Sequence, residues 1–222
     1  AYNAANTIAD ALNSILGQSI PPLEIIVVDD GSTDTTPIIV EDFGGLVTLI
    51  SQHNQGCGTA TNVGMEQVST PFMAFLDSDD LWLPDKAAMQ LQKFEEMPEL
   101  SGLCGFGQLF KGPTEDPILG PVAELWSRTT MMIRTEAAHR IGEMIDPPGG
   151  RGDTVDWIAR GRDLGLLFEI LPDTLALRRI RPGSLSYGRD AEKDKGYLFA
   201  AKRALDRKRR MLAEKNGLPN EE

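Results

Sequence analysis

Three aspartates close a short apolar run in the stretch FLDSDD, residues 75–80. Carboxylates this close together raise one another's pKa unless a positive charge lies among them. Oxygen ligands of this kind suit hard divalent cations. The spacing of Asp77, Asp79 and Asp80 therefore predicts a cation site at the end of a buried strand.

A second acid pair, Asp29 and Asp30, ends the β-branched run LEIIVVDD in the same way. We expect buried strands over residues 23–30, 46–51 and 71–77, with helices over residues 6–16, 34–42 and 59–68 between them. Strands that alternate with helices indicate a helix-covered parallel sheet, in which ligands collect at the carboxyl ends of the strands. Both acid groups stand at such ends.

The second half of the chain is less regular. The pattern predicts helices over residues 84–97, 135–141 and 153–165, strands in LSGLCGFGQLF and RTTMMIR, and a strand through Phe168 and Ile170. A long amphipathic helix is expected over residues 190–214. No segment is apolar enough over about 18 residues to cross a membrane. With two cysteines and no signal peptide, we expect a cytoplasmic protein.

Four motifs in this order, AYNAANTIADALNSILGQS, EIIVVDDGSTDTT, NQGCGTATNVG and FLDSDDLWLPDK, resemble the family 2 glycosyltransferases. The resemblance covers about residues 1–188. It implies the GT-A fold, an α/β/α sandwich with a mainly parallel mixed sheet, as one domain over residues 1–189 followed by a basic C-terminal helix and tail over residues 190–222. It also implies transfer of a sugar, with inversion, from a nucleotide-sugar donor such as a UDP-sugar to a hydroxyl acceptor.

The same resemblance assigns roles to residues. Asp79 would ligate Mg²⁺ or Mn²⁺, and Asp77 would share in the metal site and hold the ribose of the donor. Asp30 would accept a hydrogen bond from the nucleobase, Tyr2 would lie beside the base, and Gly58 would belong to the donor-binding loop. Asp80 would support this site or begin a helix.

The sequence offers two candidates for the residue that would act as the general base in this chain. The family places a Glu-Asp pair at the start of a helix, and here Asp153 and Thr154 occupy the two positions, so the expected base is replaced by threonine. Asp153 or Asp156, nearly one turn further along the helix, remains a candidate for the base. Acids at a helix N-terminus are also favoured by the helix dipole alone. A catalytically impaired nucleotide-sugar binding module is therefore the alternative function.

Two cationic positions also differ from the family pattern. Thr61 stands where the family has arginine, and Arg181 stands where it often has a histidine near the metal or diphosphate. A guanidinium does not ligate a cation but binds phosphate well. We expect Arg181 to neutralise the diphosphate and so to offset the charge missing at Thr61.

Two further expectations concern the ends of the sequence. In the family a strand comes directly before the AYN motif, so we expect either that another segment pairs with the strands beside this position or that the sheet is incomplete and destabilised. Residues 1–177 hold 9 lysines and arginines against 26 aspartates and glutamates, whereas residues 178–215 hold 13 against 5. No aromatic residues interleave the basic run over residues 202–215, so we expect no nucleic acid partner. The basic helix is compatible with docking on the acidic domain, with contact with a membrane surface, or with a homodimer.

Overall fold

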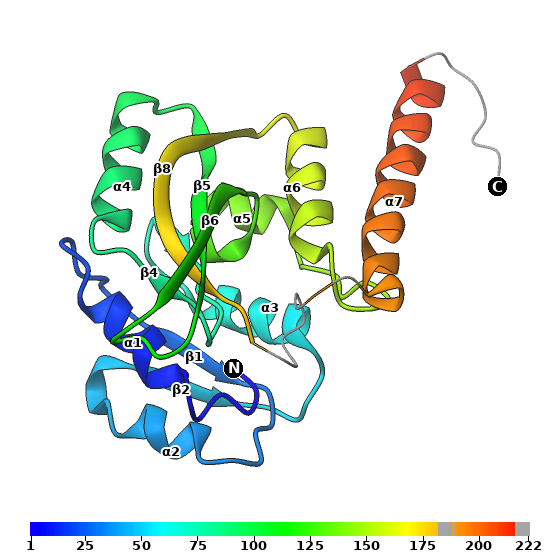
Figure 1. Cartoon of the computed structure of the whole chain (residues 1–222). Helices are drawn as coiled ribbons and strands as arrows, with labels where there is room; N and C mark the ends of the chain where they lie inside the picture. Colours follow the sequence, from blue (N-terminus) through cyan, green and yellow to red (C-terminus); the bar gives the residue numbers. More distant parts are fainter. Residues whose placement is uncertain (182–187, 189, 216–222) are drawn as a thin grey trace.

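The computed structural model describes residues 1–181, 188 and 190–215 as a mixed α/β fold (Figure 1). The helices are α1 (Ile8–Leu16), α2 (Thr36–Glu41), α3 (Cys57–Gln67), α4 (Lys86–Glu96), α5 (Thr135–Ile141), α6 (Asp153–Asp163) and α7 (Ala191–Lys215). The strands are β1 (Ile26–Asp29), β2 (Thr48–Ser51), β3 (Phe72–Ala74), β4 (Leu81–Trp82), β5 (Leu100–Lys111), β6 (Ile118–Leu125), β7 (Met132–Arg134) and β8 (Leu167–Arg179). Short 3-10 helices η1 (Gly44–Leu46) and η2 (Arg128–Thr130) complete the list.

The strands form two separate sheets within the described residues. β1 and β2 pair in parallel, and the larger sheet has the order β3-β7-β5-β8-β4 with β6 on β5. β5 and β8 form its long central pair, which runs parallel and curls across the molecule (Figure 1). The mixed α/β fold is confirmed, although antiparallel pairs have a larger share than expected because β4, β6 and β7 all pair antiparallel.

The sheet is divided, as expected, between β1 and β3. Within the described residues β1 pairs as a strand only with β2, and β3 pairs only with β7. Ala1 alone uses the other edge of β1, because its N-terminal ammonium donates to the Val28 carbonyl at 2.6 Å and its carbonyl accepts from the Asp30 amide at 2.8 Å. This is the pattern of one residue in a parallel ladder.

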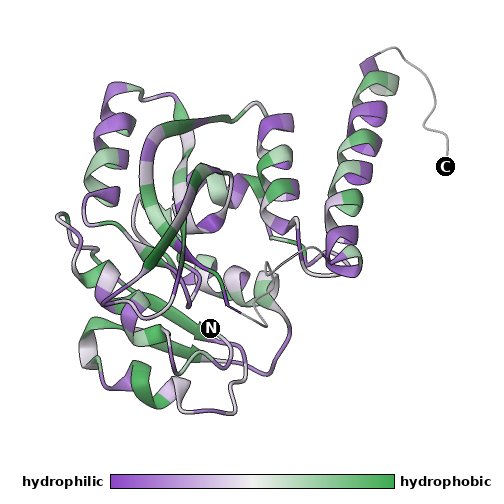
Figure 2. Ribbon diagram, in the orientation of Figure 1, coloured by the Kyte–Doolittle hydropathy of each residue, from purple (hydrophilic) through white to green (hydrophobic). Residues whose placement is uncertain are grey.

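Apolar clusters on the two sides of this division hold the elements together. α1, α2 and the β1–β2 pair share a cluster that includes Ile8, Leu12 and Val27. The larger sheet packs on α5 and α6 through a cluster around the fully buried Trp157, and Figure 2 shows apolar residues gathered along β5 and β8. The two clusters fix the two groups of elements whose ends carry the acidic residues.

Candidate active site

A cavity of about 980 Å³ opens between the two parts of the sheet. Its inner wall is apolar and is formed by β1, β3, α1 and α3. Its charged end is lined by residues predicted for the site, namely Tyr2, Asp30, Asp77, Asp79, Asp153 and Arg181. The structure therefore brings together side chains that lie up to 179 positions apart in the sequence.

The FLDSDD acids follow β3, and Asp77 and Asp79 face this charged end. Asp79 Oδ2 accepts from Arg181 Nε at 3.0 Å, so Arg181 lies at the acidic cluster. Asp77 is half-exposed and lies 3.6 Å from a guanidinium nitrogen of Arg128. The two outer acids of the motif, Asp77 and Asp79, are thus each paired with an arginine.

Asp80, by contrast, is buried and supports the site from below. Its carboxylate accepts from the Arg179 amide of β8 at 2.8 Å and from the Thr129 hydroxyl at 2.8 Å. Burial, together with the negative charges of Asp77 and Asp79, raises the pKa of Asp80 to about 8. Asp80 therefore ties the acidic turn to β8 and η2 and does not face a ligand, in agreement with the supporting role expected for it.

Arg128 is the main residue that the sequence analysis missed. Its guanidinium, almost fully buried, lies 3.0 Å from Asp153 Oδ2 and 3.6 Å from Asp77 Oδ1. It also donates to Thr61 Oγ1 at 3.0 Å and to Cys57 Sγ at 3.2 Å. Burial acts against its charge, but Asp77 and the other anionic partners outweigh burial and raise the pKa of Arg128 above its usual value. A permanent positive charge thus lies beside Thr61, the position where the arginine was expected.

One local signal for Arg128 was present in the sequence. Ser127, before the turn Arg128–Thr130, accepts from the Thr129 amide at 3.2 Å and caps the 3-10 turn that carries the arginine. An arginine inside a capped turn next to an apolar strand is a candidate for a buried cation. The need for such a cation arises because Thr61 carries no charge at the position where the family has arginine.

Asp30 lies at the carboxyl end of β1 with three bonds already made. Oδ1 accepts from Gln52 Nε2 at 2.7 Å and the Gln55 amide at 2.8 Å, and Oδ2 accepts from the Gly56 amide at 2.9 Å. An ionised carboxylate offers about four lone-pair sites, so about one remains for a ligand. Tyr2 is half-exposed at the same end of the cavity. Asp30 therefore holds the loop between β2 and α3 as well as facing the cavity.

The acids present suit a cation that a ligand helps to bind. No group of three or more histidine, cysteine, aspartate or glutamate side chains suited to a metal occurs among the described residues. Mg²⁺, however, is usually held by one or two carboxylates together with phosphates and water. Asp79 and Asp77 provide two carboxylates, and no donor from the described part of the chain reaches Asp79 Oδ1. The donor set thus fits a cation that bridges to a phosphorylated ligand.

The structure does not support the donor-binding role predicted for Gly58. Gly58 is not among the residues that line the cavity, and its amide donates to Asp146 Oδ1 at 2.8 Å. The Thr59 amide also donates to Asp146, at 3.2 Å. Asp146, which is distant in sequence, therefore satisfies the N-terminus of α3, and these amides are not directed to a ligand.

The two candidate bases lie in different places: Asp153 lines the cavity, whereas Asp156 does not. Asp153 is the first residue of α6 and lines the charged end. Asp156 is buried away from the cavity and accepts from Arg207 at 2.9 Å, with Arg203 at 3.4 Å and Arg160 at 3.2 Å. Asp156 therefore anchors α7, an element whose position the sequence alone did not give.

Comparison with known proteins identifies the family to which this chain belongs. Residues 1–134 match the model of glycosyl transferase family 2, a span that includes β1, the FLDSDD turn and Arg128. This chain belongs to glycosyl transferase family 2. The glycosyltransferase WfgD of Escherichia coli, named a UDP-Glc:α-D-GlcNAc-diphosphoundecaprenol β-1,3-glucosyltransferase, is 37% identical over 92 residues, which cover 40% of this chain and 36% of WfgD.

Solved structures support the GT-A fold of this family member. TarS from S. aureus, in complex with UDP-GlcNAc, superposes with a TM-score of 0.69 at 21% identity, over 90% of this chain and 63% of that one. The mannosyltransferase PcManGT from Pyrobaculum calidifontis, in complex with GDP-Man and Mn²⁺, gives a TM-score of 0.68 at 18% identity, over 100% of this chain and 74% of that one. This chain spans about a third of the length of several curated relatives that it matches.

Proposed function

We propose that this family 2 glycosyltransferase moves a sugar from a nucleotide-sugar donor, a UDP-sugar, to a hydroxyl acceptor with inversion. The observation that carries the proposal is the meeting of Asp30, Asp77, Asp79 and Asp153 with Arg181 at one end of the cavity. The donor class is supported by WfgD, which is named for UDP-Glc, and by TarS, whose structure holds UDP-GlcNAc.

The donor would lie along the charged end of the cavity. Asp30, with its remaining lone pair, would accept a hydrogen bond from the base, and Tyr2 would lie against the base or ribose. Asp77 would bind the ribose hydroxyls and orient the sugar. Arg181, already at Asp79, would bind a diphosphate oxygen, because a guanidinium forms paired hydrogen bonds with phosphate.

Asp79, with Asp77, would hold Mg²⁺ or Mn²⁺ against the diphosphate. The bound cation would stabilise the negative charge that develops on the leaving group. PcManGT, whose structure holds Mn²⁺ with GDP-Man, supports metal use in this fold.

Asp153 would act as the general base on the acceptor hydroxyl. It starts α6 at the cavity wall, so an acceptor that enters from this side meets its carboxylate. Removal of the hydroxyl proton in the transition state makes the oxygen a better nucleophile at the anomeric carbon. Arg128, held 3.0 Å from Asp153, would fix the direction of this carboxylate.

A second candidate function, a nucleotide-sugar binding module without turnover, is favoured by one observation. Thr154 stands at the expected base position, and the neighbouring Asp153 is already engaged by Arg128. A carboxylate oxygen that already contacts a guanidinium is less accessible to an acceptor hydroxyl, so this arrangement is compatible with donor binding alone.

An assay of donor turnover separates the two candidates. The chain would be incubated with a panel of UDP-sugars and simple glycoside acceptors, with Mn²⁺, and product formation and UDP release would be followed by mass spectrometry. The glycosyltransferase proposal predicts release of UDP with at least one donor, and NMR of the product at early times would show the inverted anomer. Binding of a donor without release of UDP, for every donor and acceptor of the panel, would support the binding-module function instead.

A further inference from the structure

The outward side of α7 carries a pattern that the proposed active site does not use. Leu198, Leu205 and Leu212 repeat every seven residues, which places them in one stripe along a helix. Their exposed fractions are 72%, 57% and 55%. Lys202, Lys208 and Arg209, all exposed, flank the stripe. We call these six residues the leucine–basic face.

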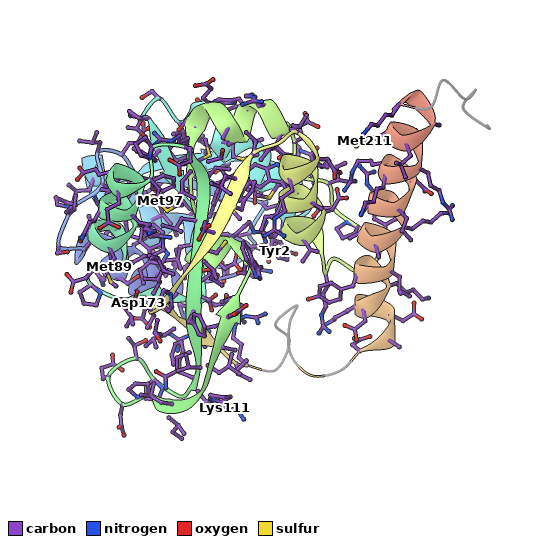
Figure 3. All side chains as sticks on the ribbon, turned by 90° about the horizontal axis from the view of Figure 1, so that it is seen from above. Tyr2, Met89, Met97, Lys111, Asp173 and Met211 are labelled. Carbon is purple, nitrogen blue, oxygen red and sulfur yellow. The ribbon has the colours of Figure 1, made fainter. Side chains whose placement is uncertain are left out.

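The opposite side of α7 attaches the helix to the domain. Ala200 is buried, and Arg207 donates to Asp156 at 2.9 Å and to Asp163 at 2.7 Å. Near the start of α7, Gly196 packs so closely that a Cβ there would collide with the Arg151 carbonyl. Figure 3 shows side chains between α6 and α7 and others that project from the far side of α7. The leucine–basic face is therefore held outward.

Charge is arranged unevenly around this face. The basic residues of the chain are concentrated after residue 177, whereas the preceding part is strongly acidic. Asp206 is the one acidic residue between Leu198 and Leu212, and it lies 3.9 Å from Arg209. Figure 2 shows polar and apolar residues alternating along α7. The leucine–basic face is thus a cationic, apolar strip on a domain of the opposite charge.

A second copy of this chain is a poor occupant for the strip. If the leucines formed the core positions of a helix pair, Lys202 and Arg209 would take the neighbouring core positions, four residues after Leu198 and Leu205. Lysine or arginine at such positions brings like charges together between the helices and destabilises the pair. An anionic surface has no such conflict, because it accepts the leucines and neutralises the cations at once.

We propose that the leucine–basic face of α7 binds an anionic lipid surface. The helix would lie in the plane of the headgroups, with its three leucines at the boundary with the acyl chains and its basic residues on the acidic headgroups. Within the described part of the chain no helix is long and apolar enough to cross a membrane, so the contact would be peripheral. Burial of the three leucines and attraction of the three cations would each contribute weakly to binding. The attachment would therefore be reversible and sensitive to salt.

Co-sedimentation of the whole chain with vesicles tests this proposal. Vesicles of phosphatidylcholine alone would be compared with vesicles of phosphatidylcholine and phosphatidylglycerol in equal amounts, at low and raised salt. The chain is expected to sediment with the anionic vesicles at low salt and to be released by salt. The double variants Lys202→Gln/Arg209→Gln and Leu198→Ser/Leu205→Ser should each lower the apparent affinity by about tenfold or more.

Matched controls keep the test specific. Arg140→Gln removes an exposed cation from α5, and Leu23→Ser removes a leucine that is 87% exposed outside α7, so both should bind as the unchanged chain does. Circular dichroism would show that helix content is kept in every variant. Absence of binding to anionic vesicles at low salt would overturn the proposal, as would equal losses in the control variants. Dimer formation that Leu198→Ser/Leu205→Ser abolishes, without vesicle binding, would instead identify a second copy as the occupant.

Discussion

Arg128 lies 3.0 Å from Asp153 and links it to Asp77, because its other guanidinium nitrogen lies 3.6 Å from Asp77. The same side chain donates to Thr61, so a cation from η2 occupies the region where an arginine of α3 was expected. The guanidinium thus comes from a different element, and the hydroxyl of Thr61 now accepts from it.

Replacing Arg128 should impair turnover more than donor binding. We expect Arg128→Ala to lower kcat by roughly 100-fold, since the orientation of Asp153 and one cation of the site are lost together. Arg128→Lys keeps the charge but loses the planar fork, and should recover only part of the activity. Steady-state kinetics would check this. A change confined to KM in both variants would contradict the positioning of Asp153 by Arg128.

A comparison of Asp153 and Asp156 tests the assignment of the base. Asp153→Asn should lower kcat by roughly 100- to 10,000-fold with little change in donor affinity, as loss of a general base does. Asp156→Asn should leave kcat within about threefold but lower the free energy of unfolding by about 3 kcal/mol, because Arg160 and Arg203 lose the buried carboxylate with which they pair, while Arg207 keeps Asp163. Kinetics and urea unfolding of the two variants would be measured together. The reverse pattern would move the base to Asp156.

Lys86 gives a pH-dependent contribution to stability. It is fully buried, donates to Gln90 Oε1 at 2.7 Å and lies 4.2 Å from the centre of the Trp82 ring. Burial lowers its pKa from 10.5 to about 7. Between these two values the unfolded chain binds more protons than the folded chain, so the contribution of Lys86 to the free energy of unfolding rises with pH over this window.

Lys86→Met isolates that contribution. The free energy of unfolding of the unchanged chain, minus that of the variant, should increase from pH 7 to pH 10 by up to about 1.4 kcal/mol per pH unit. Groups that are common to both proteins cancel in the difference. Chemical unfolding across this pH range would measure it, and a difference that stays flat would show that Lys86 keeps an ordinary pKa.

The division of the sheet predicts that the fold accepts one more strand. The groove between β1 and β3 is apolar, and Ala1 already bonds to β1 as a residue of a parallel strand. An extension of five β-branched residues placed before Ala1 should raise the free energy of unfolding by roughly 2 to 4 kcal/mol, since burial of each side chain contributes about 1.5–3 kcal/mol and ordering each residue costs about 1–2 kcal/mol. A glycine-serine extension of equal length is the control. Equal unfolding curves for both extensions would mean that the groove does not take a strand.

Short-range patterns in the sequence were enough to place most elements. Asp30 and Asp77 do follow strands, β1 and β3, as their apolar runs predicted. The helices α1, α3 and α6 start within two residues of the expected positions. These runs and helices show patterns in the sequence itself, so local physics places them, although none of the three helices has a side-chain N-cap. Strand β6, by contrast, is mostly exposed, and its weak apolar alternation left no clear signal.

The missed features of the site depend on contacts between distant segments. Whether Asp153 or Asp156 faces the cavity depends on where α7 lies, and α7 begins about 35 residues after Asp156. In the same way, Gly58 lost its expected role because Asp146, 88 positions away, reaches its amide. Arg128 enters the site only when η2 packs beneath the FLDSDD turn. The boundary proposed at residue 189 and the tail over residues 216–222 lie outside the described residues and stay predictions.

Calorimetric titration of UDP tests the central claim, that Asp79 and Asp77 hold a divalent cation against a diphosphate. UDP should bind at least about tenfold more tightly with Mn²⁺ than with a chelator, and Asp79→Asn should reduce this gain to within about twofold, because the cation loses its principal protein ligand. Asp85→Asn, a change at an exposed acid outside the cavity, is the control. UDP affinity that is the same with and without Mn²⁺, or a gain that survives Asp79→Asn, would contradict the account.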